Sequence, residues 1–394
     1  MSKCFKHAVV LSALILGVTL CAAGQSLDSV STSIPSARTS ALGGPHAALA
    51  DDFTTLFNNP AGFEAAKPSI EISELAVRLR GPIFDIASVA ASGAGGNITQ
   101  LLTSQNVQNL LKSIYASMDL IGPIQFGYVG HGLGFGIFNS SELTLMNTAP
   151  FTLGAGLSEQ LMLVGGYAFR IPLPSALDST LDVGVNLKGI LQGTSAIEDS
   201  LLVLPTLLSS LGASTLTSAP FYFDTAIGVD AGIRYSYRDL LSVGIVGKNI
   251  YTPDLQSYYG TMQDFLNGTA AASTTNTVIP FNLSAGVLFT PRISLLDRYI
   301  TGLKLMLDYN DIVGFLTHAA TANNPLLNIG LGTEITLLNI LDLRGGFYEG
   351  LFSAGLGLDL KYFRIDAAMF GTEMSTQPGL NPVFNILVAI SFKA

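Results

Sequence analysis

Histidine and cysteine are the residue types from which catalytic and metal centres are most often built, and this 394-residue chain has four histidines and two cysteines. His46, His131 and His318 lie far apart in the sequence. Neither a G-x-S-x-G motif nor a metal-ligand spacing accompanies them. We therefore predict that the protein is not an enzyme and has no cofactor or bound metal. Asp51-Asp52 could bind a cation, but polar chemistry at the end of a short helical turn is the more ordinary explanation.

Basic side chains in an apolar chain are the other candidates for chemistry, because they could hold the carboxylate of a ligand. Arg170, Lys188, Arg234 and Lys248 each fall on the polar face of a predicted strand. The same face carries many further charges of both signs, so we expect most of them to pair with one another. They are Asp182, Asp224, Asp230, Lys304, Asp308, Glu334, Asp342, Arg344, Asp359, Lys361, Arg364 and Asp366.

The composition indicates a membrane protein without a helical span. The chain is 48% hydrophobic and 12% charged, with a mean hydropathy of +0.47, whereas an ordinary soluble domain has about 25% charged residues. Beyond the N-terminus there is no apolar run of the roughly 18 residues that a membrane helix needs. An alternation of lipid-facing and lumen-facing side chains explains both observations, since it gives an apolar composition without apolar runs.

Residues 1–24 have the features of a secretory signal peptide. Lys3 and Lys6 precede an apolar stretch, and small residues follow at positions 22–24. A lipoprotein signal with Cys21 as the modified residue is the alternative. Ordinary cleavage removes both cysteines and two of the 19 basic residues, which leaves 17 against 28 acidic ones and a net charge of −11. Such a charge argues against nucleic acid as a partner.

Period-two alternation predicts the strands. In LDVGVNLK, from Leu181 to Lys188, leucine and valine alternate with polar residues and glycine. Similar segments recur about fourteen times, so we predict an all-β fold: a transmembrane antiparallel β-barrel of about 14 strands spanning residues 70–394. Long connections at 81–122, 139–159, 191–222 and 250–280 alternate with short turns, which places both termini on the periplasmic side of a bacterial outer membrane.

Residues 25–69, between the signal and the first strand, are small, turn-rich and too apolar for a disordered tail. Pro60 and Gly62 belong to a turn. A fourteen-stranded lumen is wider than side chains alone can fill. We therefore predict that this segment is a plug inside the barrel. Its predicted residues are Gly43, Gly44, Asp51, Asp52, Phe57, Asn59, Pro60 and Gly62.

The N-terminal motifs resemble those of a known family. Arg38, Ala41-Leu42-Gly43-Gly44, Ala48-Leu49-Ala50-Asp51-Asp52 and Asn59-Pro60-Ala61-Gly62 look like the hatch signature of FadL-type outer-membrane transporters and their PorV-like relatives. The signature covers about 25 residues of the 394. The resemblance implies passive transport of long-chain fatty acids or other hydrophobic molecules. It also implies a sideways opening at the third strand, here Gly132, Gly134 and Gly136, for which a glycine-rich strand in an intact wall is the alternative.

Apolar outer loops are the predicted site of ligand capture, as the resemblance implies. The connection at 191–222 contains several leucines, and that at 250–280 contains aromatic residues. Exposed apolar patches usually bind a ligand, a membrane or a partner, although the loops could instead pack against each other. The predicted residues are Leu201, Leu204, Leu207, Leu208, Leu211, Tyr258 and Phe265.

Other functions fit the same pattern. A structural or secretion-associated barrel with a protein partner, as in PorV-like relatives, is the main alternative. An open porin is another, although the predicted plug argues against it. In either case we expect contact with outer-membrane lipids and with the barrel-assembly machinery.

Overall fold

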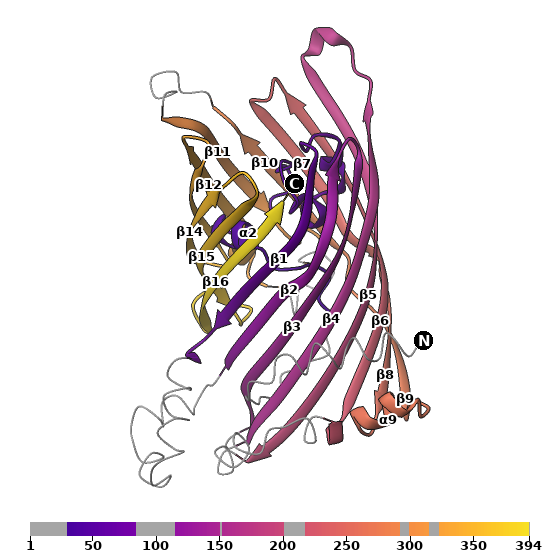
Figure 1. Cartoon of the computed structure of the whole chain (residues 1–394). Helices are drawn as coiled ribbons and strands as arrows, with labels where there is room; N and C mark the ends of the chain where they lie inside the picture. The colour runs from indigo at the N-terminus through magenta and orange to yellow at the C-terminus, as the bar shows by residue number, and fades with distance from the viewer. Residues whose placement is uncertain are drawn as a thin grey trace.

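A computed structural model describes residues 30–83, 115–149, 152–200, 217–291, 299–314 and 323–393. Its strands form one antiparallel sheet that closes on itself through pairing of β5 with β6 (Figure 1). The strands are β1 (Ser69–Arg80), β2 (Tyr115–Gly130), β3 (Leu133–Ala149), β4 (Thr152–Ile171), β5 (Ser179–Ser200), β6 (Phe221–Tyr237), β7 (Leu241–Tyr251), β8 (Pro253–Tyr259), β9 (Ser273–Val278), β10 (Asn282–Phe289), β11 (Ile300–Tyr309), β12 (Ile329–Leu337), β13 (Leu341–Tyr348), β14 (Leu351–Asp359), β15 (Phe363–Glu373) and β16 (Pro382–Lys393).

These sixteen segments make fourteen barrel strands, as the alternation predicts. β7 and β8 are separated only by Thr252, and both pair with β6. β9 and β10 pair in turn with β8 and β7. Each of these two pairs of segments is therefore one long strand with an interruption.

The wall is taller on one side than on the other. β4 and β5 have 20 and 22 residues, whereas β13 and β14 have 8 and 9. All four predicted long loops are accordingly wrong in part. Most of 139–159 belongs to β3 and β4, residues 115–122 belong to β2, and residues 191–200 belong to β5. Residues 250–280 are largely the hairpin β8–β9 with α9 (Met262–Asn267) at its tip. Strand ends that extend beyond a bilayer need no apolar alternation, so their Ser, Thr and Gly residues resemble a loop.

The outer face carries an apolar band, and the inner face is polar. Leu187, Ile233 and Leu307 are about half exposed on the outside, while their neighbours Asp182, Asp230 and Asp308 are almost fully buried inside. Tyrosine and phenylalanine supply the exterior aromatic side chains, since the chain has no tryptophan. Such a surface is what a barrel presents to lipid. No helix among the described residues has the length and hydropathy to cross a membrane.

Residues 30–68, named here the N-terminal segment, lie inside the barrel (Figure 1). The segment holds three short helices, α2 (Ala37–Ala41), α3 (Thr55–Asn58) and η1 (Pro60–Glu64). α2 packs against β13 to β16, and η1 packs against β2 to β6. Two further short helices, η2 (Ser175–Leu177) and η4 (Pro325–Asn328), lie in connections between barrel strands. β1 starts beside the last residues of β16, with Glu71 opposite Lys393. The described chain therefore ends at the same rim of the barrel at which β1 begins.

Candidate functional site

The N-terminal segment sits in notches that glycine provides. A Cβ added to Gly184 of β5 would come within 2.5 Å of the Pro60 carbonyl, and one added to Gly332 of β12 within 2.6 Å of the Leu42 carbonyl. Distances this short exclude any side chain, so the segment's backbone touches the wall itself. Similar notches around the lumen are Gly127, Gly134, Gly232, Gly244, Gly346 and Gly355.

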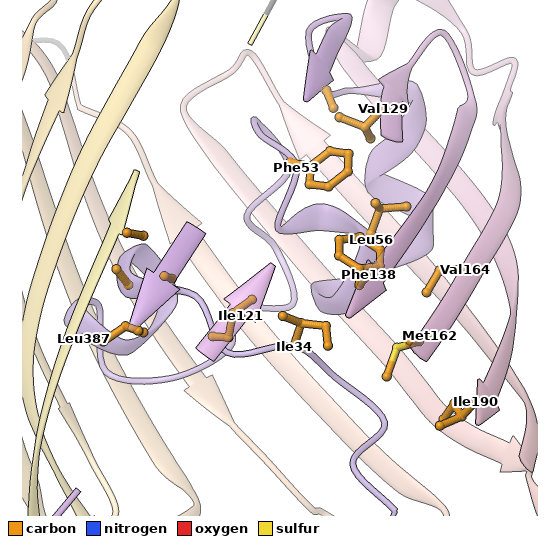
Figure 2. Close-up of a cluster of buried hydrophobic side chains, with 14 of the residues drawn as sticks. Ile34, Phe53, Leu56, Ile121, Val129, Phe138, Met162, Val164, Ile190 and Leu387 are labelled. Atoms are coloured by element: carbon orange, nitrogen blue, oxygen red, sulfur yellow. The ribbon is translucent and has the colours of Figure 1, made fainter. Parts of the chain in front are cut away.

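One face of the segment is apolar. Leu56 and Phe63 are fully buried against the inward side chains of β2 to β5, including Phe138 and Met162. Figure 2 shows Leu56, Phe53 and Phe138 pointing toward one another across this contact. The rings of Phe57 and Phe138 are 5.0 Å apart and edge-on, the arrangement that aromatic pairs favour.

The opposite face of the segment is charged. The Arg38 guanidinium lies 2.7 Å from Asp51, 2.6 Å from Asp52 and 2.7 Å from Glu334 of β12. Lys304 of β11 bridges Asp51 and Glu334 at 2.6 Å each. Asp51 and Asp52 are therefore the partners of a buried arginine. Among the described residues, no cluster of three or more His, Cys, Asp or Glu side chains could hold a metal ion.

The network continues along the wall. Arg344 contacts Glu334, Asp342 and Asp366, and Arg364 contacts Asp342, Asp359 and Asp366. Within the segment, burial alone would lower the pKa of Arg38, but Asp51, Asp52 and Glu334 outweigh it and hold that pKa well above its usual value. Burial would raise the pKa of Asp51, yet Arg38 and Lys304 hold it well below the ordinary range.

The other predicted plug residues fix the segment's shape. Gly43 and Gly44 have φ of 79° and 94°, which glycine adopts without strain. The Asn59 side chain accepts from the Ala61 N–H at 3.0 Å and donates to the Ala47 carbonyl at 2.8 Å. A Cβ at Gly62 would come within 2.7 Å of Ala50. These contacts join the motifs at 38–52 to the motif at 59–62.

The histidines lie in different parts of the molecule. The Nδ1 of His46 lies 2.5 Å from Asp308 of β11, and its Nε2 lies 2.9 Å from the Leu42 carbonyl, both deep in the lumen. His131 lies in the β2–β3 turn, 3.0 Å from the Tyr128 hydroxyl. His318 lies outside the described residues.

The predicted carboxylate-binding residues separate into two kinds. Arg170 bonds Asp182 at 2.7 Å, Lys188 lies 2.9 Å from Asp230, and Arg234 donates to the Ala48 carbonyl at 2.9 Å. Each of these three side chains therefore already has a partner within the barrel. Lys248 of β7 differs, since it lines the lumen cavity and forms no ion pair or hydrogen bond among the described residues. Lys361, which we predicted to face inward, is exposed in a turn beside the Tyr362 ring.

The predicted capture residues are only partly described. Leu201, Leu204, Leu207, Leu208 and Leu211 lie outside the described residues. Tyr258 belongs to β8, with its ring 5.1 Å from that of Tyr222. Phe265 of α9 is 3% exposed and packs against Phe221 and Phe223. Its position corresponds to the alternative in which the outer segments pack against each other.

The wall is continuous where the third-strand glycines lie. Gly134 and Gly136 of β3 pair with both β2 and β4. A Cβ at Gly134 would meet the Phe63 ring at 2.7 Å. The described backbone therefore corresponds to the intact-wall alternative, with the N-terminal segment packed on a glycine-rich strand.

The pairing is interrupted instead between β1 and β2. Glu71 pairs with Gly127 and Ala76 with Ile121, but residues 72–75 have no Cα partner on β2. β2 bulges at the same level, because three of its residues, 122–124, face one residue of β3. Side chains partly replace the ladder: Ser73 donates to the Pro123 carbonyl at 2.9 Å, and Asn139 accepts from the Ile124 N–H at 2.8 Å.

A cavity of about 920 Å³ lies between the N-terminal segment and this part of the wall. Its lining is of mixed character, with aromatic side chains from the segment and the wall and charged side chains from β1, β7 and β11 to β16. The residues that matter below are Phe53, Phe57, Glu71, Glu74, Gln125, Phe138, Lys248 and Phe370.

Comparison with known proteins gives similarity at the level of solved structures. No protein-family model and no curated relative matches the sequence. The toluene transporter TbuX of Ralstonia pickettii is 13% identical, over 90% of this chain and 96% of that one, with a TM-score of 0.49. A FadL homologue of Pseudomonas aeruginosa is 13% identical, over 89% and 95%, with a TM-score of 0.42. The Pseudomonas putida toluene transporter TodX is 11% identical, over 90% and 96%, with a TM-score of 0.40. Sequence identities and TM-scores this low assign no function to this chain.

Proposed function

We propose that this chain is an outer-membrane barrel that passively transports long-chain fatty acids or similar hydrophobic molecules. Apolar outer loops capture the molecule, the N-terminal segment acts as a plug, and release is sideways into the membrane. The observation that carries the proposal is the cavity beside an interrupted stretch of wall. The hatch-like signature of the sequence supports it, and we propose that both termini lie on the periplasmic side.

The filled lumen favours a sideways exit over an aqueous pore. The N-terminal segment spans the lumen from the apolar contact at β2–β5 to the ion pairs at β11–β16. The stretch of β1 that lacks partners on β2 has Ile72 and Leu75 exposed on its outer face at 52% and 46%. A molecule that leaves here passes from the cavity to lipid. Its transfer to an apolar medium is favoured by about 0.8 kcal/mol for each CH₂ group removed from water.

Lys248 is the basic side chain that we propose for a carboxylate head group. An ammonium that lines the cavity without a partner among the described residues can accept an anionic ligand without breaking an existing ion pair. Replacing Lys248 by Met should weaken binding of dodecanoate and leave that of dodecanol unchanged. The same change at Lys188, which already has Asp230, should act on folding instead.

A crosslink tests the exit. The cysteines at 4 and 21 belong to the predicted signal, so an engineered pair would have no competitor in the mature chain. Ser73→Cys with Ile124→Cys, joined by a short bismaleimide, should stop uptake of a fluorescent long-chain fatty acid by cells. Val77→Cys with Leu120→Cys joins the same two strands where pairing is regular and should leave uptake intact. Equal uptake by both crosslinked proteins would place the exit elsewhere.

A second test addresses capture. Leu207→Asp with Leu208→Asp should abolish uptake, because both changes put charge into the proposed apolar loop. Unchanged uptake would remove the loop from the proposed route. Binding of dodecanol to the purified double variant then tells whether the inner cavity remains accessible.

Partner binding is the second candidate function, and one observation favours it. All six residues of β9 are exposed, and among the described residues β9 pairs only with β8. An exposed edge strand can accept a strand from another protein. Co-purification of a stoichiometric protein, lost when Thr275 is replaced by Pro, together with no retained lipid, would favour this function over transport.

A further inference from the structure

Two carboxylates of β1 that line the cavity have no basic partner among the described residues. Glu71 and Glu74 of β1 both line the cavity, and neither forms an ion pair among the described residues. Elsewhere in the lumen the acidic side chains Asp51, Glu334 and Asp366 each contact at least one Arg or Lys. The pair therefore lies beside the interrupted wall without the basic partner that these other acidic side chains have.

A β-bulge brings the two carboxylates to the same face. In a regular strand, residues three apart point to opposite faces. Here Ile70, Ile72, Leu75 and Val77 are all outward and exposed, so the alternation slips by one residue between 72 and 75. The register with β16 shifts between Glu71 and Ser73, where this stretch begins. A bulge of this kind commonly re-aims a side chain at a functional position.

Gln125 adds an acceptor to the pair. Its side chain is 4% exposed, it lines the same cavity, and its amide nitrogen donates to Glu71. Its amide oxygen is buried without a hydrogen-bond partner. A buried amide oxygen without a partner costs free energy unless a donor reaches it.

We propose that Glu71, Glu74 and Gln125 form a binding site for the primary ammonium group of a hydrophobic ligand. A primary ammonium carries one positive charge and three N–H donors, which match two carboxylates and one amide oxygen. No group of three or more His, Cys, Asp or Glu side chains that could hold a metal ion occurs here among the described residues. This inference rests on the proposed transport function and extends its substrates to long-chain amines. Carboxylates would hold the positive head group of an amine, whereas Lys248 would hold the negative head group of a fatty acid.

Three ligands of equal chain length test the site. Native mass spectrometry of the purified full-length barrel in mild detergent would compare dodecylamine, dodecanoate and dodecanol. Replacing Glu71 and Glu74 by Gln should lower dodecylamine affinity by about tenfold or more, the ratio that a charge-assisted hydrogen bond is worth. Dodecanol and dodecanoate should bind as before. Glu142→Gln, at a carboxylate that pairs with Arg80 outside the cavity lining, is the matched control and should leave all three unchanged.

The outcomes separate this inference from the transport proposal. If no ligand is retained by the unmodified protein, the transport proposal fails. If dodecanol and dodecanoate bind while dodecylamine gains nothing from Glu71 and Glu74, only the ammonium site is overturned, and the two carboxylates share a proton instead. Glu74→Gln alone removes one charge with little change of shape, and it should give a partial loss if the double variant does not fold.

The same ammonium could belong to a lipid head group. Lysophosphatidylethanolamine carries a primary ammonium beside a phosphate, whereas dodecylamine has no phosphate. Retention of the lysolipid, lost in the Glu71→Gln and Glu74→Gln variant, would identify a membrane lipid as the source. Retention of dodecylamine alone would identify a free amine.

Discussion

The two faces of the N-terminal segment are held in the lumen by different forces. Toward β2–β5 the contact is apolar, centred on Leu56, Phe63 and Phe138. Toward β11–β15 an apolar contact of Leu42 with Met306 is joined by ion pairs around Arg38 and Glu334. Apolar burial is non-directional and insensitive to pH, whereas buried ion pairs depend on geometry and protonation. One face of the segment should therefore respond to changes that leave the other unaffected.

The largest expected effect is at the charged face. Replacing Arg38 by Met leaves Asp51, Asp52 and Glu334 without their shared partner, and loss of one member of a buried ion pair costs about 3–5 kcal/mol. Chemical unfolding should show this loss, and protease should cleave the segment. Arg238→Met breaks a pair with Asp178 in which both side chains are more than half exposed, so it should cost less than about 1 kcal/mol. Similar losses in the two variants would contradict a special role for Arg38.

Truncating a side chain of the apolar face should cause a comparable loss of stability, and this loss should not depend on pH. Leu56 is 0% exposed, and truncating a buried leucine to alanine costs about 2–5 kcal/mol. The same unfolding measurement at pH 5 and pH 8 should give one value for Leu56→Ala. Leu240→Ala, in an exposed turn, is the control. A pH-dependent loss at Leu56 would mean that the two faces are coupled.

Filling a glycine notch in the wall should have an intermediate effect on the stability of the protein. Gly345 and Gly346 are neighbours on β13, but an added Cβ meets nothing at Gly345 and meets the Leu42 carbonyl at 2.6 Å at Gly346. Overpacking costs about 1–3 kcal/mol, so Gly346→Ala should destabilise the protein while Gly345→Ala should not. Thermal unfolding of both variants decides this. Equal melting temperatures would show that the segment yields without cost.

Lowering the pH from neutrality should have the smallest effect on the stability of the protein. The pKa of Asp51 in the folded state is held below its unfolded value, so Asp51 contributes stability that is complete above the unfolded value, about 3.9, and is lost as pH falls toward the folded one. Hydrogen exchange between pH 5 and pH 2 should therefore rise in α2 before it rises in α3 and η1. Simultaneous opening would show that the segment moves as one cooperative body.

The sequence predicted the regular part of the molecule well. Alternation placed Asp182, Lys188 and Arg234 on the inner face, where they are buried. Alternation could not have placed Glu71 and Glu74 of β1 on the same face, because the bulge between them breaks the period of two on which such a prediction depends. The pairing of Arg38 with Glu334, 296 residues apart, has no local signal at all. Local patterns report which face a side chain takes, whereas partners across a lumen depend on how the sheet closes.

The notches also bear on the order in which the molecule is assembled. They are contributed by strands from β2 to β14, so they surround the segment only after the sheet has curled. Arg38 can reach Glu334 only once both residues have been synthesised and β12 has its place, and contacts so distant in sequence form late and slowly. The segment precedes the barrel strands in the sequence, yet we expect it to dock among the last elements. Its docking therefore reports that the barrel has closed, and a barrel that closes around an empty lumen would be an assembly error recognisable by protease.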